Sequence, residues 1–191
     1  MPERNQAALE FLLNRRSRPA KTLGAPAPDR DALMQILEAA ARSPDHGKLE
    51  PWRFVVLEKP ALARLVAAIP ARAEATGQPE WKGRSVAELY AGAELVVAVI
   101  SAPKEGNIPE IEQVYSAGAV CLALLNAALA AGWGANWITG WISHDRAFMA
   151  EMIGLGPGES VAGLIHLGTE TARPGERPRP DVAAITTWLQ S

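Results

Sequence analysis

The chain has 191 residues, 48% of them hydrophobic, and its 19 lysines and arginines against 21 acidic residues give a formal net charge of −2. This length suits one domain with a sizeable core, and the balanced charge excludes a global basic field that would hold nucleic acid or an anionic membrane. The single cysteine, Cys121, excludes an internal disulfide framework, and its apolar neighbours indicate a packed core thiol. The first twenty residues carry charge throughout and lack the apolar core of a signal peptide, which predicts a cytoplasmic protein.

The first half of the chain predicts three helices and one strand. Apolar spacing predicts the three helices, and a β-branched run the strand. In chain order these are a helix over 4–16, a helix over 29–43 that stops before Pro44, a strand over 53–58, and a helix over 60–69 closed by Pro70. The following stretch, 70–86, is polar and broken by Pro79 and Gly83, so it is expected as a mobile excursion. Whether 71–85 forms a lid is left open.

The second half predicts three strands and two helices. They are a strand over 93–101 that is covered on both faces, a long helix beginning near 109–112, a strand over 134–141, a helix over 143–154 capped by Ser143 and ended by Gly154, and a strand over 160–169. The tail over 172–191 opens with three prolines in its first nine residues and ends with apolar residues. Such a tail is either disordered or an arm that packs across a partner, and its apolar end favours the arm.

The segment 115–137 is almost free of charge and has marginal length for a membrane span. It is rich in alanine and glycine, contains Asn126 and Asn136, and lacks flanking basic clusters, so a buried central helix is the stronger interpretation. One small domain rarely encloses so long an apolar helix on every side. A second subunit is therefore expected to cover one face. Helices and strands mix without strict alternation, which predicts a single α+β domain with a mixed sheet flanked by helices.

Familiar catalytic and phosphate-loop signatures are absent, and His46, His144 and His166 lack the spacing of metal ligands. If the protein is an enzyme, a bound cofactor is expected to supply the reactive group. Three stretches are candidates for holding it. They are "NRRSR" at 14–18, whose donors suit a phosphate, the loop with Arg42, His46 and Lys48, and "GANWITG" at 134–140 with Trp137. Each stretch alone has an ordinary structural explanation: a helix end, a polar turn and a buried strand.

Four stretches in the same order resemble motifs of the FMN-dependent nitroreductase family, and most of all its small YdjA-like branch of NAD(P)H nitroreductases. These are "LLNRRSRP", "ARSPDHGKLEPWRFVVL", "YSAGAVCLALLNAALAAGWGANWITG" and "VAGLIHLGTETARPGERPRP". The resemblance implies an intertwined homodimer with two FMN sites at the subunit interface, in which the C-terminal arm, about 172–191, packs on the partner.

The resemblance also implies roles for particular residues, each at the position that matches the family's motif. By this resemblance the FMN phosphate and ribityl chain would be bound by Arg15, Arg16 and Ser17. Arg173 would make a further contact with the phosphate. Arg42 and His46 would contact the same flavin from the other subunit. Trp137, Ile138 and Thr139 would line the flavin ring. Contact with NADH or NADPH falls to Ala127, Ala128, Leu129, Ala130, Ala131 and Gly132.

The chain departs from the family pattern at several of these positions. The loop carries Asp45, Lys48 and Glu50 where serine, asparagine and glutamine are common, and Ile138 stands where the close branch tends to have arginine. No side chain is expected to be catalytic itself, and Lys48 is a speculative cation at the flavin edge.

The implied function is ping-pong hydride transfer from NAD(P)H through FMN to a nitroaromatic, quinone or similar small acceptor. Two alternatives remain open at the level of sequence: a flavin-fragmenting or dehalogenating enzyme on the same fold, and an FMN-binding dimer without turnover.

Overall fold

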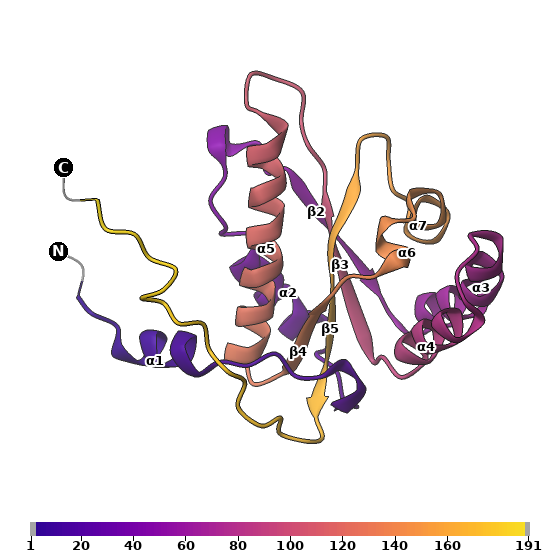
Figure 1. Cartoon of the computed structure of the whole chain (residues 1–191), viewed down its shortest axis with the longest axis horizontal. Helices are drawn as coiled ribbons and strands as arrows, with labels where there is room; N and C mark the ends of the chain where they lie inside the picture. The colour runs from indigo at the N-terminus through magenta and orange to yellow at the C-terminus, as the bar shows by residue number, and fades with distance from the viewer. Residues whose placement is uncertain (1–2, 190–191) are drawn as a thin grey trace.

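The computed structural model describes residues 3–189 and has three layers, in which one sheet lies between two layers of helices (Figure 1). The helices are α1 (Gln6–Asn14), α2 (Arg30–Ala40), α3 (Lys59–Ala75), α4 (Glu80–Ala91), α5 (Glu110–Ala130), α6 (Trp141–His144) and α7 (Arg146–Ile153), with short 3-10 turns η1 (Ala20–Thr22) and η2 (His46–Lys48). The strands are β1 (Leu23–Gly24), β2 (Trp52–Leu57), β3 (Leu95–Ser101), β4 (Gly134–Ile138) and β5 (Ser160–Glu170). The expected α+β class is confirmed.

The sheet is organised around β5. Along one edge β5 pairs with β3, and β3 pairs with β2. Along its other edge β5 pairs first with β4, at residues 164–168, and further along with β1, at residues 169–170. Every pairing in residues 3–189 is antiparallel, so the expectation of a mixed sheet is wrong in this respect. The long helix α5 does connect two parallel strands, β3 and β4, but β5 enters the sheet between them, and the two never become neighbours.

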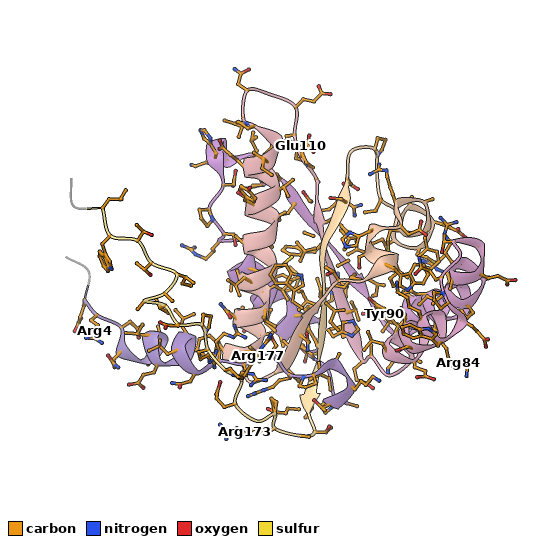
Figure 2. All side chains as sticks on the ribbon, in the orientation of Figure 1. Arg4, Arg84, Tyr90, Glu110, Arg173 and Arg177 are labelled. Carbon is orange, nitrogen blue, oxygen red and sulfur yellow. The ribbon has the colours of Figure 1, made fainter. Side chains whose placement is uncertain are left out.

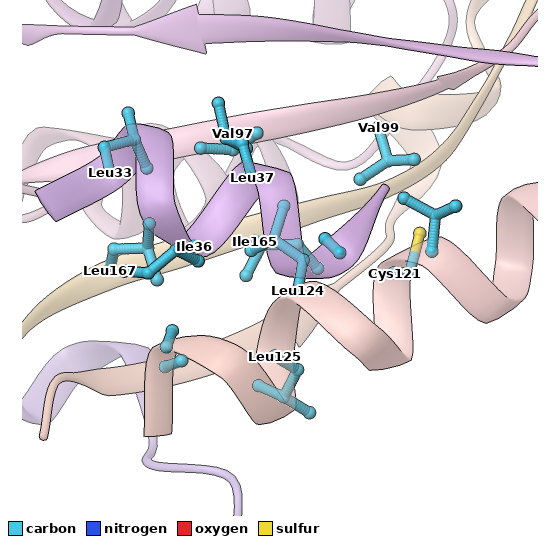
Figure 3. Close-up of a cluster of buried hydrophobic side chains, with 14 of the residues drawn as sticks. Leu33, Ile36, Leu37, Val97, Val99, Cys121, Leu124, Leu125, Ile165 and Leu167 are labelled. Atoms are coloured by element: carbon cyan, nitrogen blue, oxygen red, sulfur yellow. The ribbon is translucent and has the colours of Figure 1, made fainter. Parts of the chain in front are cut away.

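One face of the sheet is covered by α2 and α5. Leucines and isoleucines of α2 meet Val120, Cys121 and Leu124 of α5 over the odd-numbered side chains of β3, and Figure 3 shows this cluster. Cys121 is fully buried there, as its apolar neighbours predicted, and burial raises the pKa of its thiol to about 12.

The opposite face is covered by α3, α4, α6 and α7. The even-numbered side chains of β3, Val96, Ala98 and Ile100, point into this second core. Because successive side chains of a strand alternate between faces, a strand covered on both sides is expected to be a continuous apolar run, as β3 is from Leu95 to Ile100. The prediction of a doubly covered strand over this segment is confirmed.

The polar stretch 70–86 is helical, and the expectation of a mobile excursion is wrong. The helix α3 continues through Pro70 to Ala75, and α4 begins at Glu80. Pro70 is exposed, while Ile69 and Ala73 on either side of it are buried. Core packing on the buried face therefore outweighs the cost of a proline inside the helix. Gly83 allows the two helices to approach so closely that a Cβ there would lie 2.7 Å from the Cβ of Ala73.

The predicted helix over 143–154 is divided at Asp145. Its carboxylate accepts a hydrogen bond from the Phe148 amide and begins α7, so the cap is Asp145 and not Ser143. Arg72 of α3 donates two hydrogen bonds to the same carboxylate, at 2.6 and 2.7 Å. This ion pair fixes the start of α7 against α3. Gly154 ends the helix in the left-handed conformation, as predicted.

The long helix α5 is apolar and long enough to cross a membrane by length and composition alone, but in this fold it packs on the sheet. Its outward side exposes Ile111, Val114, Tyr115 and Leu122. Figure 1 shows α1 and the C-terminal segment on this same side of the molecule. The C-terminal segment has no regular strand or helix up to residue 189, and the last two residues of the expected arm lie outside the described range.

Burial of His166 makes the stability of the fold depend on pH. The imidazole on β5 is 2% exposed, its ring centroid lies 5.1 Å from that of Tyr90 on α4, and burial lowers its pKa from 6.5 to about 4. The unfolded chain therefore takes up a proton between these two pH values while the folded chain does not.

We expect the contribution of His166 to the free energy of unfolding to be at its maximum above pH 6.5. This contribution should decrease by about 3 kcal/mol as the pH drops towards 4. Denaturant unfolding at a series of pH values measures this loss. The His166→Gln variant should lack this component, whereas His144→Gln, at an exposed histidine, should keep it. Identical pH dependences in the two variants would contradict the assignment.

Candidate functional site

The basic segment that follows α1 is fixed to the edge of the sheet. Arg15 ends the helix by donating its amide to the Phe11 carbonyl at 2.8 Å. The next turn of chain is held by β4: the Arg18 amide donates to the Ala135 carbonyl at 2.8 Å, and Asn136 donates to the Arg18 carbonyl at 2.6 Å. These contacts bring the donors of 15–17 close to Trp137 on the same strand.

A cavity of about 730 Å³ opens beside this segment. Its lining combines Arg15, Arg16 and Ser17 with apolar side chains of α5 and β4 and with the C-terminal segment. The other lining residues are Leu122, Leu125, Trp137, Arg177, Pro178, Arg179 and Pro180. The volume and the mixture of many apolar groups with a few convergent polar ones are typical of a small-molecule or cofactor site.

The arginines of the cavity repel one another. The pKa of the Arg15 guanidinium is lowered first by burial and then by the charges of Arg179, Arg16 and Arg18. Its buried Nε has no hydrogen-bond partner within residues 3–189. Glu170 pairs with Arg18 at 3.0 Å and Glu176 pairs with Arg179 at 2.9 Å, so part of this positive charge is neutralised. An anionic group in the cavity would satisfy both the charge and the donors.

Two of these arginines were missed by the sequence analysis, and one predicted arginine lies elsewhere. Arg173 is exposed in the chain after β5 and does not line the cavity, whereas Arg177 and Arg179 do. Figure 2 labels Arg173 and Arg177 close to the lower end of α5. Arg16 binds the Gly175 carbonyl and so draws this segment in. The signal for these residues was the alternating "RPRP", whose position relative to the cavity only the fold could give.

Of the three predicted residues in β4 and the turn after it, only one lines the cavity. Trp137 lines the cavity with its indole 37% exposed. Because neighbouring side chains of a strand alternate, Ile138 faces away from Trp137, and neither it nor Thr139 is part of the lining.

A smaller cavity of about 320 Å³ also borders the arginine segment. It shares Arg15 and Arg16 with the first cavity and includes Leu129 and Gly132 from the predicted nicotinamide-cofactor stretch. Of the remaining predicted positions, Ala128 is buried in the core, and Ala127, Ala130 and Ala131 line neither cavity. The structure thus brings part of the 127–132 stretch to the arginines.

The loop over 42–50 lies near the opposite end of α5. His46 pairs with Glu112 in the first turn of α5, with Nδ1 2.8 Å from Oε2. Along α5, Glu112 lies about 15–20 Å from Leu122 and Leu125, the residues of this helix that line the arginine cavity. None of Arg42, His46 and Lys48 lines the arginine cavity within one chain, and the assignment of Arg42 and His46 to a second subunit stays a prediction.

The backbone of this loop is strained and held by its own side chains. The backbone φ angles of Lys48 and Glu50 are 55° and 49°. Residues other than glycine and asparagine rarely adopt this left-handed conformation. The carboxylate of Asp45 accepts hydrogen bonds from the amides of Leu49 and Glu50, at 2.6 and 3.3 Å, and stabilises the conformation. Lys48 and Glu50, which stand where the resembling family commonly has asparagine and glutamine, therefore both occupy strained backbone positions. Lys48 is exposed.

The arrangement fits a ligand with an anionic group at one end and a flat apolar part at the other. The unneutralised arginines and the unpartnered Arg15 Nε suit a phosphate, while Trp137, Leu122 and Leu125 suit an aromatic ring system.

Comparison with known proteins shows what the chain is similar to. The model of the "Nitroreductase family" matches residues 12–169. "Putative NAD(P)H nitroreductase YdjA" of Escherichia coli K12 is 34% identical over 163 residues, which span 85% of this chain and 87% of that protein. A nitroreductase-like protein from Bacillus cereus has the same fold, with a TM-score of 0.81, 21% identity and full coverage of both chains. A nitroreductase from Desulfovibrio desulfuricans, solved in complex with FMN, has a TM-score of 0.75 at 23% identity, with 99% and 100% coverage.

Proposed function

The chain belongs to the nitroreductase family, and from this premise we propose that it is an FMN-dependent NAD(P)H oxidoreductase. The observation that carries the proposal is the cavity in which partly unneutralised arginines meet Trp137 and apolar side chains of α5. Bound FMN would supply the redox chemistry, accepting a hydride from NADH or NADPH and passing it to a nitroaromatic, quinone or similar small acceptor.

The phosphate end of FMN is assigned to the arginine cluster. Arg15 and Arg16 offer guanidinium groups and Ser17 a hydroxyl, and Arg15 Nη2 already lies 3.5 Å from Ser17 Oγ. Arg177 and Arg179 complete the cluster in the role that the sequence gave to Arg173. Burial, and then the charges of the neighbouring arginines, lower the pKa of Arg15, and a dianionic phosphate would offset the second of these effects.

The ring end is assigned to Trp137 and the α5 side chains beside it. Trp137, Leu122 and Leu125 present an apolar wall, which would exclude water from one side of a bound flavin. Leu129 and Gly132 in the smaller cavity lie near the same arginines, and a contact with the nicotinamide cofactor is proposed there.

A homodimer would complete this site. The outward side of α5 is apolar and exposed, as are Leu12 and Leu13 of α1 and Val182, Ile185 and Trp188 of the C-terminal segment. Two α5 helices that pack antiparallel about a two-fold axis would bring the start of one helix to the end of the other. The partner's Arg42 and His46 would then face the arginine cavity of the first subunit. The arm over 172–191 is proposed to pack on the partner as well.

The first test is the absorbance spectrum of the purified protein. The protein is expected to be yellow, with FMN that bleaches under anaerobic NADH or NADPH and recovers when a nitroaromatic or quinone is added. A colourless protein that ignores added FMN would overturn the proposal. Flavin that neither nucleotide reduces would support the alternative of an FMN-binding dimer without turnover.

The second test separates the two tail arginines. Arg179→Ala should raise the Kd for FMN about 10- to 100-fold, because it removes a charged donor from the phosphate end. Arg173→Ala, an equal loss of charge a few residues away, should leave the Kd within about twofold because this side chain does not line the cavity. Titration of apoprotein with FMN, followed by flavin fluorescence, measures both values. Equal effects of the two variants would contradict the assignment of the phosphate end to the cavity.

The third test concerns the dimer. Tyr115 on α5 and Trp81 on α4 are each 69% exposed, but they lie in helices on opposite faces of the sheet. Tyr115→Arg should convert the dimer to monomers that retain less FMN, because it places a charge in the proposed apolar interface. Trp81→Arg is the matched control and should leave the dimer intact. Sedimentation velocity measures the oligomeric state, and a Tyr115→Arg protein that stays dimeric would contradict this interface.

A further inference from the structure

Gly163 lies on β5 directly beneath the side chain of Trp137. In the register of β4 and β5, Trp137 pairs with Ile165, and Gly163 is two residues further along the same face of β5. Side chains at such diagonal positions are within reach of an aromatic residue. The indole of Trp137 therefore leans across Gly163 towards α5.

The indole occupies the space that a side chain at position 163 would need. A Cβ built on Gly163 would lie 2.2 Å from Trp137 Nε1, 2.7 Å from Trp137 Cδ1 and 2.9 Å from Cys121 Sγ. These distances are below van der Waals contact, so any residue other than glycine must displace the indole by a large amount and the Cys121 sulfur by a smaller one. Space, and not backbone conformation, demands glycine here, because Gly163 is not among the glycines with positive φ.

Of the two neighbours, the indole is the one that is free to move. Cys121 is fully buried in the core between α2, α5 and the sheet, where displacement would disturb close packing. Trp137 is 37% exposed and borders the cavity of about 730 Å³, so it has open space beside it.

We infer that Gly163 is a positioning residue that sets the depth of the Trp137 indole and thereby the width of the cofactor cavity. The absent side chain lets the indole lie close to β5 at Gly163, which keeps the space between Trp137 and the arginine cluster open. The consequence for cofactor binding rests on the proposed function, whereas the position of the indole does not.

Gly163→Ala tests the inference with two independent readouts. The added methyl group should push the indole into the cavity and raise the Kd for FMN about tenfold or more. In apoprotein labelled with 5-fluorotryptophan, the ¹⁹F resonance of Trp137, assigned from its loss in Trp137→Phe, should shift. The control is Gly92→Ala at the end of α4, where the nearest atom to a new Cβ is the Glu88 carbonyl oxygen at 3.7 Å. This control should change neither readout.

A double variant covers the case in which Gly163→Ala folds poorly. If the clash acts through the indole, Trp137→Ala should make room for the new methyl group. The decrease in Tm caused by Gly163→Ala should then be largely reversed when Trp137→Ala is added. Adding Cys121→Ala instead should reverse little of this decrease. Recovery through Cys121→Ala instead, or additive losses with Trp137→Ala, would overturn the inference.

The two proposals fail in different ways. An unmoved Trp137 resonance in Gly163→Ala, or an unchanged Kd in a protein that binds FMN, would overturn the positioning role. A wild-type protein that does not bind FMN would overturn the proposed function, and the ¹⁹F shift in the apoprotein would still decide the role of Gly163.

Discussion

The rest of the structure depends on the burial of β5, which is hydrogen-bonded along both edges and covered by helices on both faces. A strand so enclosed must satisfy its backbone through its neighbours and leaves little freedom to its side chains. Three of its residues show this constraint. Gly163 makes room for Trp137, His166 is held neutral against Tyr90, and Glu170 anchors Arg18. The position of the candidate site and the pH dependence of the fold therefore share one origin.

The candidate site destabilises the protein when no ligand is bound. Burial and neighbouring cations lower the pKa of Arg15, and one of its buried donors lacks a partner within residues 3–189. Such an arrangement weakens the unliganded fold and strengthens the attraction for an anion. The strained loop at Lys48 and Glu50 shows the same pattern at the other end of α5. Strain and uncompensated charge thus gather where we propose that cofactor and partner subunit meet.

Much of the candidate site could be read from the sequence, because its donors are consecutive. Arg15, Arg16 and Ser17 stand together at a helix end, and Trp137 lies in a recognisable strand. The residues that come from a distance were harder to predict. Arg177 and Arg179 line the cavity because the chain after β5 turns back towards Arg16, and the RPRP pattern that contains them does not by itself place them there. The close approach of Gly163 and Trp137 likewise depends on the register between two strands that are distant in sequence.

The sequence by itself determined the periodic elements, the doubly covered strand, the buried thiol and the resemblance to the family, since each depends on side-chain pattern over a few residues. Only the tertiary structure decided that α3 passes through Pro70, that Asp145 begins α7, and that β5 lies between β3 and β4. In each case the physical reason is contact between parts of the chain that are distant in sequence, including the Arg72–Asp145 ion pair at the start of α7. Local preferences for ending, capping or pairing amount to about 1–3 kcal/mol, and burial of an apolar face against the rest of the molecule outweighs them.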